Sequence, residues 1–193
     1  MMWEFKQFST RRRVSLSLVG LVVLFSTSSV AAQWGASIAS GYGAANIVPL
    51  RIGIQKQFPK RWRTDSAWPI YGYWEGSLYH MNGKKGVKPN SHKRLSAAAL
   101  AAVARVERAQ QTRIGWPYVE IGFGASWVSK TEIGGRDLGI HFQFEDRIGL
   151  GFRFGDQKEY DIGYKAIHFS NAYIGPSNHG INLHVLTFNY WFS

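Results

Sequence analysis

Polar and apolar residues alternate along most of the chain after position 33, in stretches of about ten residues separated by polar turns with Gly or Pro. The clearest example covers 138–154. Its even positions from Phe142 to Phe154 are mostly apolar, and its odd positions from His141 to Arg153 are mostly polar. Because successive side chains of a strand point to opposite faces, this pattern predicts strands with one apolar face. We expect strands at 34–43, 46–57, 67–80, 94–107, 115–128, 138–154, 158–170 and 181–192.

An even number of such strands is typical of a small outer-membrane barrel, in which every backbone polar group is paired and no sheet edge meets lipid. The sequence therefore predicts an all-β fold, an eight-stranded antiparallel transmembrane β-barrel. Alternation alone does not exclude a soluble barrel with its apolar side chains inside. Aromatic residues make up 15% of the chain, and Phe188, Tyr190 and Phe192 share one face of the last segment. These aromatics favour a membrane-interface girdle.

A barrel of this size is too narrow for a pore, so its interior must be filled with side chains. We expect Glu120, Glu145, Arg147 and Arg153 to fill it as ion pairs. The stretch from Arg94 to Arg108, RLSAAALAAVARVER, is rich in alanine and favours a helix by propensity. We assign it as the fourth strand, because closing the barrel requires an even number.

Residues 1–32 have the features of a secretory signal peptide: basic residues up to Arg13, an apolar run from Val14 to Phe25, and small residues before Gln33. The apolar run is about 12 residues long, shorter than the ~20 of a membrane-spanning helix. Arg11 to Arg13 also resemble a twin-arginine signal, which would export a folded soluble protein. We expect a cleaved signal peptide and a single barrel domain at 33–193.

The chain has a net charge of +11 and no cysteine, so disulfides do not stabilise it. Basic residues gather in or next to the turn at 81–93, namely Lys84, Lys85, Lys88, His92, Lys93 and Arg94. A basic loop on the outer side would suit a leaflet of phosphorylated glycolipid. A merely solvated loop explains the same residues.

The candidate chemistry lies between Tyr164 and Asn182, YKAIHFSNAYIGPSNHGIN. His168 and Ser170 are two positions apart on an expected strand, so they project from one face and can meet as base and nucleophile. They follow Tyr164 and Ala166 on that face, so the pair caps an apolar surface, as suits an enzyme that acts on a membrane lipid. With both chain ends in the periplasm, the seventh strand carries the pair to the outer leaflet.

The remaining histidines give a weaker signal. His184 lies on the face of Asn182 and is an alternative catalytic partner or an interface residue. The others show no metal-like spacing with carboxylates, namely His80, His92, His141 and His179. We expect no metal and no cofactor.

The chain resembles the outer-membrane lipid A 3-O-deacylases, the PagL family. The resemblance is strongest from Pro117 onward, in PYVEIGFGASWVS, FQFEDRIGLGFRFG, AIHFSNA and PSNHGIN. It implies a serine esterase in the cell outer membrane that hydrolyses the 3-linked 3-hydroxyacyl ester of lipid A in lipopolysaccharide. It also implies a site on the lipid-facing wall, at the outer ends of strands seven and eight.

The resemblance gives individual residues a role. Ser170 matches the nucleophile, His168 the general base and Asn171 a side-chain oxyanion donor, which a backbone N–H near Tyr173 would assist. The third catalytic position, often glutamate in the family, falls on Asn182, and the family commonly has glycine at Tyr173.

Asparagine can orient the imidazole but supplies no charge to it. A turn centred near 155–157 would bring Asp146 to the same outward face, about one pair away from His168. We expect lipid A as substrate, the outer membrane as environment and no nucleic acid as partner; a homodimer stays open. The alternatives are a non-enzymatic barrel of structural or adhesin type and an acyltransferase.

Overall fold

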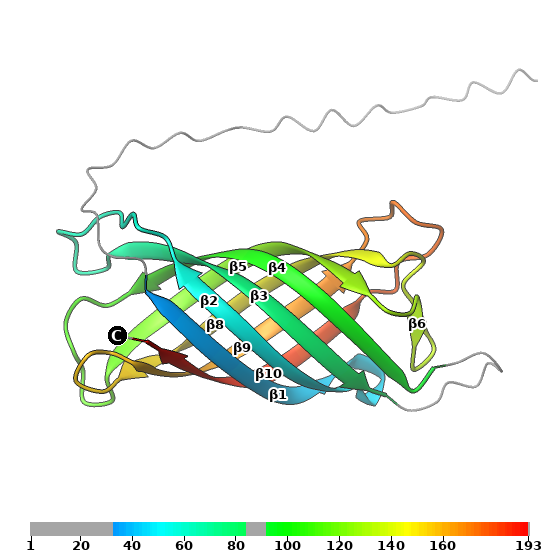
Figure 1. Cartoon of the computed structure of the whole chain (residues 1–193), viewed down its shortest axis with the longest axis horizontal. Helices are drawn as coiled ribbons and strands as arrows, with labels where there is room; N and C mark the ends of the chain where they lie inside the picture. Colours follow the sequence, from blue (N-terminus) through cyan, green and yellow to red (C-terminus); the bar gives the residue numbers. More distant parts are fainter. Residues whose placement is uncertain (1–32, 84–91, 193) are drawn as a thin grey trace, which may run out of the picture.

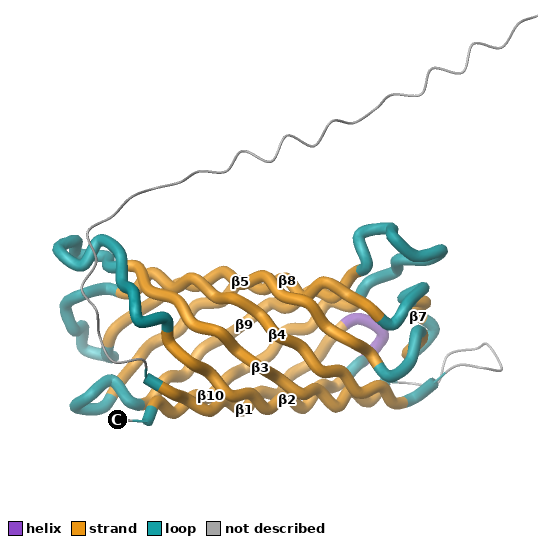
Figure 2. Tube along the Cα trace, turned by 45° about the horizontal axis from the view of Figure 1, so that its top comes forward, coloured by secondary structure: helices purple, strands orange, loops and turns teal. Residues whose placement is uncertain are grey.

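The computed structural model of the chain describes residues 33–83 and 92–192. Eight strands form a closed antiparallel barrel (Figures 1 and 2), which confirms the expected fold. They are β1 (Trp34–Gly43), β2 (Val48–Gln57), β3 (Ile70–Asn82), β4 (Arg94–Glu107), β5 (Trp116–Val128), β8 (Phe142–Phe154), β9 (Tyr160–Ser170) and β10 (Ile181–Trp191). Across 33–83 and 92–192, no helix has the length and apolar character needed to cross a membrane.

The first and last strands close the barrel. Ile38 of β1 lies opposite Ile52 of β2 on one side and Phe188 of β10 on the other. Each barrel strand thus has two partners, which removes the exposed edges that a sheet would otherwise present. The expected signal peptide at 1–32 and the basic residues at 84–91 lie outside the described residues.

The alanine-rich stretch is a strand, as assigned. β4 pairs with β3 from Arg94 to Val106 and with β5 from Ala97 to Glu107. Backbone pairing on both sides outweighs the helical propensity of alanine, which is a weak preference that tertiary contacts override.

The two faces of the wall follow the alternation in the sequence. In β8, Ile148 and Leu150 point outward and are exposed, whereas Glu145 and Arg147 point into the lumen and are buried. A polar interior and an apolar exterior reverse the arrangement of a soluble barrel. This distribution is that of a barrel surrounded by lipid.

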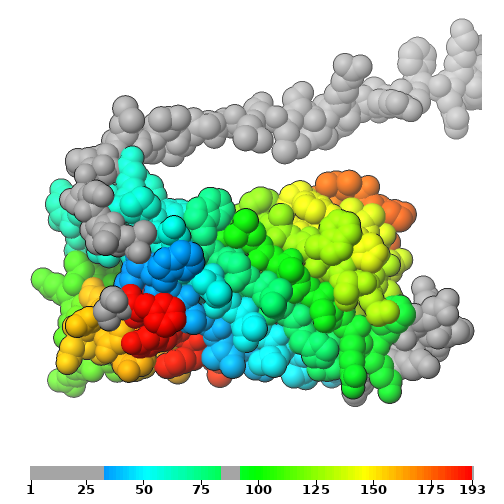
Figure 3. Space-filling model, in the orientation of Figure 1, coloured from blue at the N-terminus to red at the C-terminus, as the bar shows by residue number. Residues whose placement is uncertain are grey.

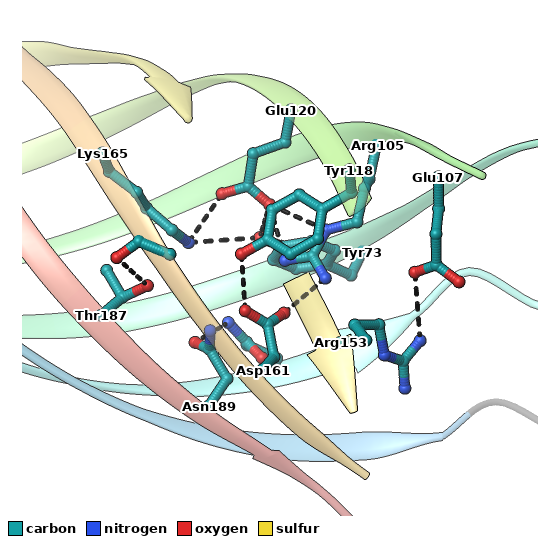
Figure 4. A network of polar contacts seen from close by, with 12 residues as sticks. Tyr73, Arg105, Glu107, Tyr118, Glu120, Arg153, Asp161, Lys165, Thr187 and Asn189 are labelled. Atoms are coloured by element: carbon teal, nitrogen blue, oxygen red, sulfur yellow. Dashed lines mark hydrogen bonds and ion pairs between the residues drawn. The ribbon is translucent and has the colours of Figure 1, made fainter. Parts of the chain in front are cut away.

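Buried ion pairs fill the part of the lumen that lies toward the chain termini. Figure 4 shows this network. Arg105 binds Asp161 at 2.5 Å and Glu120 at 2.7 Å, and Lys165 binds the other oxygen of Glu120 at 2.7 Å. The hydroxyl of Tyr118 donates to Asp161 at 2.5 Å. Each charge therefore has a partner of opposite sign, without which burial would be costly.

A second set of ion pairs surrounds Glu75. Its carboxylate binds Arg51 at 2.5 Å and also Arg147, which in turn binds Glu145. Arg153 lies 3.8 Å from Glu107. The expected ion-paired filling by Glu120, Glu145, Arg147 and Arg153 is confirmed.

A hairpin that the sequence did not predict covers one end of the barrel. It consists of β6 (Glu132–Ile133) and β7 (Arg136–Asp137), and it lies at the end opposite the described chain termini (Figure 1). Ile133 and Leu138 of the hairpin segment are fully buried in the same apolar cluster as Ile47. We call this end, which also carries residues 171–180, the outer end. The 3-10 turn η1 (Ala44–Asn46) joins β1 to β2 there.

Candidate active site

His168 and Ser170 lie on the outside of the barrel, at the outer end of β9. Phe169, which lies between the two, and Ile167, which precedes His168, are buried in the lumen. Because side chains alternate along a strand, His168 and Ser170 point to the lipid-facing wall. The structure thus places both side chains on the face and at the end that the sequence predicted.

Neighbouring strands present two polar side chains to His168. Asn182 of β10 and Asp146 of β8 are its direct cross-strand partners. Asn182 Oδ1 lies 2.5 Å from His168 Nδ1, so Nδ1–H is the donor of this bond, and Nε2 carries the free lone pair. The expected offset of Asp146 by one pair is corrected: β8 and β9 pair from Phe154 and Tyr160 onward, which sets Asp146 directly opposite His168.

A groove begins at His168 and runs along the outer wall. Its volume is about 560 Å³, and Ala166 provides a small side chain between its larger cross-strand neighbours Ile148 and His184. Asp146 and Asn182 line the groove next to His168. An apolar trough on a lipid-facing wall, with polar groups at one end, suits an acyl chain whose ester lies at the polar end.

His184 lies at the edge of this groove but is not bonded to His168. Its Nδ1 lies 2.5 Å from the hydroxyl of Tyr164, and its ring stacks on Tyr42 with centroids 5.5 Å apart. Of the two roles open to His184, this geometry favours that of an interface residue.

Aromatic side chains of β8 and β5 lie beside Ser170. Phe144 of β8 is the cross-strand partner of Ser170, and it stacks on Phe123 with centroids 5.5 Å apart. Phe142 contacts Phe144 edge to face at 5.1 Å. The nucleophile candidate is therefore bordered by an apolar ledge that belongs to β5 and β8.

The chain turns sharply after Ser170. Ala172 and Tyr173 have φ values of 51° and 61°, and Ile174 N–H donates to Asn171 C=O at 3.0 Å. Left-handed backbone at a residue other than glycine costs free energy, and such strain gathers at functional sites. The turn brings consecutive backbone N–H groups close to the end of β9.

Asn171 is buried, and its side-chain amide is already engaged. Nδ2 donates to the carbonyls of Leu138 and Ser177, both at 2.7 Å. Both amide hydrogens are thus committed, so Asn171 does not offer a free donor to Ser170 in this conformation. Tyr173 is strongly exposed, with 83% of its surface accessible.

Arg136 was not predicted from the sequence, yet it holds the loop at 171–180 in place. Its Nε donates to Gly180 C=O at 2.5 Å, and Nη2 donates to His179 C=O. The signal that was missed is Gly134-Gly135, where φ values of 60° and 85° form a tight hairpin turn. Arg136 therefore links the hairpin to the segment that leads into Asn182.

Comparisons with known proteins agree with the barrel fold. The sequence model of the family described as Lipid A 3-O-deacylase (PagL) matches residues 49–191. The lipid A deacylase PagL of Pseudomonas aeruginosa is 32% identical over 174 residues, which cover 88% of this chain and 95% of that protein. The protein of the same name from Bordetella bronchiseptica is 41% identical over 75 residues, or 39% of this chain and 41% of its own length. The crystal structure of the outer membrane enzyme PagL superposes with a TM-score of 0.72 at 28% identity, covering 81% of this chain and 98% of that one.

Proposed function

Because this chain belongs to the lipid A 3-O-deacylase (PagL) family, we propose that it performs that reaction as a serine esterase, with Ser170 as nucleophile and His168 as general base. The protein is an outer-membrane enzyme that removes the 3-O-linked acyl chain of lipid A. The observation that carries the residue assignment is the position of His168, which is oriented by Asn182 and stands at the polar end of the groove.

The proposed first step forms an acyl-enzyme. The Ser170 hydroxyl gives its proton to His168 Nε2 while the serine oxygen attacks the ester carbonyl carbon. When the tetrahedral intermediate collapses, the bond to the sugar oxygen breaks, and that oxygen takes the proton from His168. Among the described residues, no hydrogen bond yet joins His168 to Ser170, and such bonds often tighten only with substrate bound.

The second step hydrolyses the acyl-enzyme. His168 takes a proton from water, whose oxygen attacks the acyl carbon, and the proton then returns to Ser170 as the free fatty acid leaves. The acyl chain lies in the groove over Ala166 throughout, since the groove starts at His168.

Oxyanion stabilisation in this proposal comes from Asn171 and from the backbone N–H of Tyr173. Asn171 must first release Leu138 C=O or Ser177 C=O, which requires a rotation of its side chain. Each donor aimed at the developing charge lowers the activation free energy by about 3 kcal/mol. Asp146, opposite His168, would add favourable charge as the imidazolium forms. An unchanged rate in Asp146→Asn would rule out that contribution.

Lipid A mass spectra from cells that express the chain test the proposal. We expect loss of the 3-linked acyl chain with the wild type and with Ser40→Ala, an exposed serine of the lipid-facing wall on β1. Ser170→Ala and His168→Asn should fold as heat-modifiable barrels and leave lipid A intact. Deacylation by a folded Ser170→Ala barrel would refute the nucleophile assignment.

Two further readouts belong to the same experiment. Free 3-hydroxy fatty acid should accumulate, and an acylated acceptor in its place would indicate the acyltransferase alternative. The proposal also includes removal of residues 1–32 on export, so the mature protein should begin at Gln33.

A further inference from the structure

The wall opposite the candidate site carries a second groove. In the closed order of eight strands, β3 is four strands away from β9, the largest separation possible. The groove has a volume of about 410 Å³ and is lined by side chains of β2, β3 and β4, with Ile52, Ile54 and Leu78 around Gly76 and Ala98. These strands lie side by side, from cyan to green, on the face shown in Figure 3.

Gly76 makes this part of the wall hollow. It belongs to the outward-facing set of β3, and a Cβ built on it would have no heavy atom within 4 Å. Packing therefore does not require glycine there. The missing side chain leaves room on a surface that is otherwise covered by branched apolar residues.

Polar and basic side chains stand directly above the groove, toward the outer end. His80 and Ser96 form the next outward pair above Leu78 and Ala98, and His80 Nδ1 lies 3.4 Å from Ser96 Oγ. Above them, Arg94 is exposed opposite Asn82. Lys93 is also exposed, and within 33–83 and 92–192 no ion pair engages either Lys93 or Arg94.

We propose that this wall binds a second lipid A molecule, which is held and not cleaved. Its phosphate would pair with Arg94 and Lys93, its sugar hydroxyls would meet His80 and Ser96, and one acyl chain would fill the groove over Gly76. Exposed cations above an apolar trough match the charge and shape of a phosphorylated, acylated headgroup. The groove lies near mid-height of the barrel, and the polar residues above it lie toward the outer end, where the outer-membrane enzyme meets its own substrate lipid.

Ser96 lacks the nearby backbone N–H donors that the turn after Ser170 would offer to an oxyanion. Its backbone N–H donates at 2.9 Å to Oγ of Ser129, the residue that follows β5, and Ser129 N–H donates to Ser96 C=O at 2.8 Å. No strained turn with free N–H groups follows it, as one follows Ser170. The wall therefore offers affinity for lipid A without a place to stabilise an oxyanion.

Native mass spectrometry of the purified Ser170→Ala barrel in detergent, titrated with bisphosphorylated lipid A, tests the proposal without turnover. We expect two lipid A molecules per barrel at saturation. Adding Gly76→Leu or Arg94→Gln should weaken the second binding event by tenfold or more and leave the first unchanged. Dephosphorylated lipid A should bind once.

Two substitutions serve as matched controls, one at Arg108, which directly follows β4, and one at Ala104 in the half of β4 away from Arg94. Arg108→Gln removes the same charge, and Ala104→Leu adds the same kind of side chain to the outward face; both should leave two bound lipids. A single lipid at saturation, or a second affinity that changes less than twofold in both test variants, would overturn the proposal. Equal retention of phosphatidylglycerol would overturn the assignment to lipid A.

The outcome is independent of the catalytic assignment. Gly76→Leu in the otherwise wild-type enzyme should deacylate lipid A in detergent within twofold of the normal rate. Failure of the esterase proposal would appear as hydrolysis in Ser170→Ala, whereas failure of the second site would appear only in the number of lipids bound.

Discussion

Replacing Asn182 tests how His168 is held for catalysis. Asn182 Oδ1 accepts the hydrogen bond from His168 Nδ1 at 2.5 Å, which leaves the lone pair of Nε2 free for its proposed role as base. A neutral hydrogen bond contributes about 0.5–1.5 kcal/mol, and 1.4 kcal/mol corresponds to a tenfold change in rate. We therefore expect Asn182→Ala to lower turnover roughly two- to tenfold, because the ring then samples the wrong tautomer and orientation.

A glutamate at the same position should act in the opposite direction. Once His168 has taken the proton from Ser170, a carboxylate at 182 makes the bond charge-assisted, which is roughly twice as strong as a neutral one. A gain of about 1 kcal/mol predicts that Asn182→Glu works roughly fivefold faster than the wild type.

The assay is the initial rate of 3-hydroxy fatty acid release from lipid A in detergent, normalised to the folded fraction on a heat-shift gel. Leu186→Ala is the matched control, because Leu186 is exposed on the same face of β10 and lies outside the groove. Unchanged turnover in Asn182→Ala, or a glutamate variant slower than the wild type, would contradict the role of Asn182.

Three further substitutions test other parts of the structure. Ala166→Phe should lower kcat/KM by roughly tenfold or more, about 1.4 kcal/mol, because the ring occupies the groove; esters with short acyl chains should be less affected. Glu75→Gln should destabilise the barrel by about 3–5 kcal/mol in urea unfolding, because Arg51 and Arg147 lose their buried counter-charge, while the folded fraction keeps its turnover. Tyr173→Gly should stabilise the fold by about 1 kcal/mol in the same unfolding assay, since glycine adopts a φ of 61° without strain.

The sequence predicted the strands and their faces well, because a strand imposes a period of two on its side chains. His168 and Ser170 had to share a face, and Phe169 between them had to occupy the other. In a barrel, lipid selects the apolar face for the exterior, so one pattern determines both the core and the wall.

Contacts between strands and loops were harder to predict. The position of Asp146 opposite His168 depends on the five residues at 155–159 that join β8 to β9, where Lys158 adopts a φ of 58°. The bond from Asn171 to Leu138 depends on the segment of the β6–β7 hairpin, which is distant in sequence from the loop it contacts. The alternation of polar and apolar residues along the chain carries no information on turn geometry or on loop packing.

The buried ion pairs also determine on which side of the wall the chemistry takes place. Asp161 and Lys165 of β9 point into the lumen, where they bind Arg105 at 2.5 Å and Glu120 at 2.7 Å. A slip of β9 by one residue would turn both charges toward lipid and carry His168 and Ser170 into the lumen. Because an uncompensated buried charge costs several kcal/mol, these pairs hold β9 in the one register that exposes the catalytic candidates. Stability and the proposed catalysis thus belong to opposite faces of one strand, and the inner face determines the orientation of the outer one.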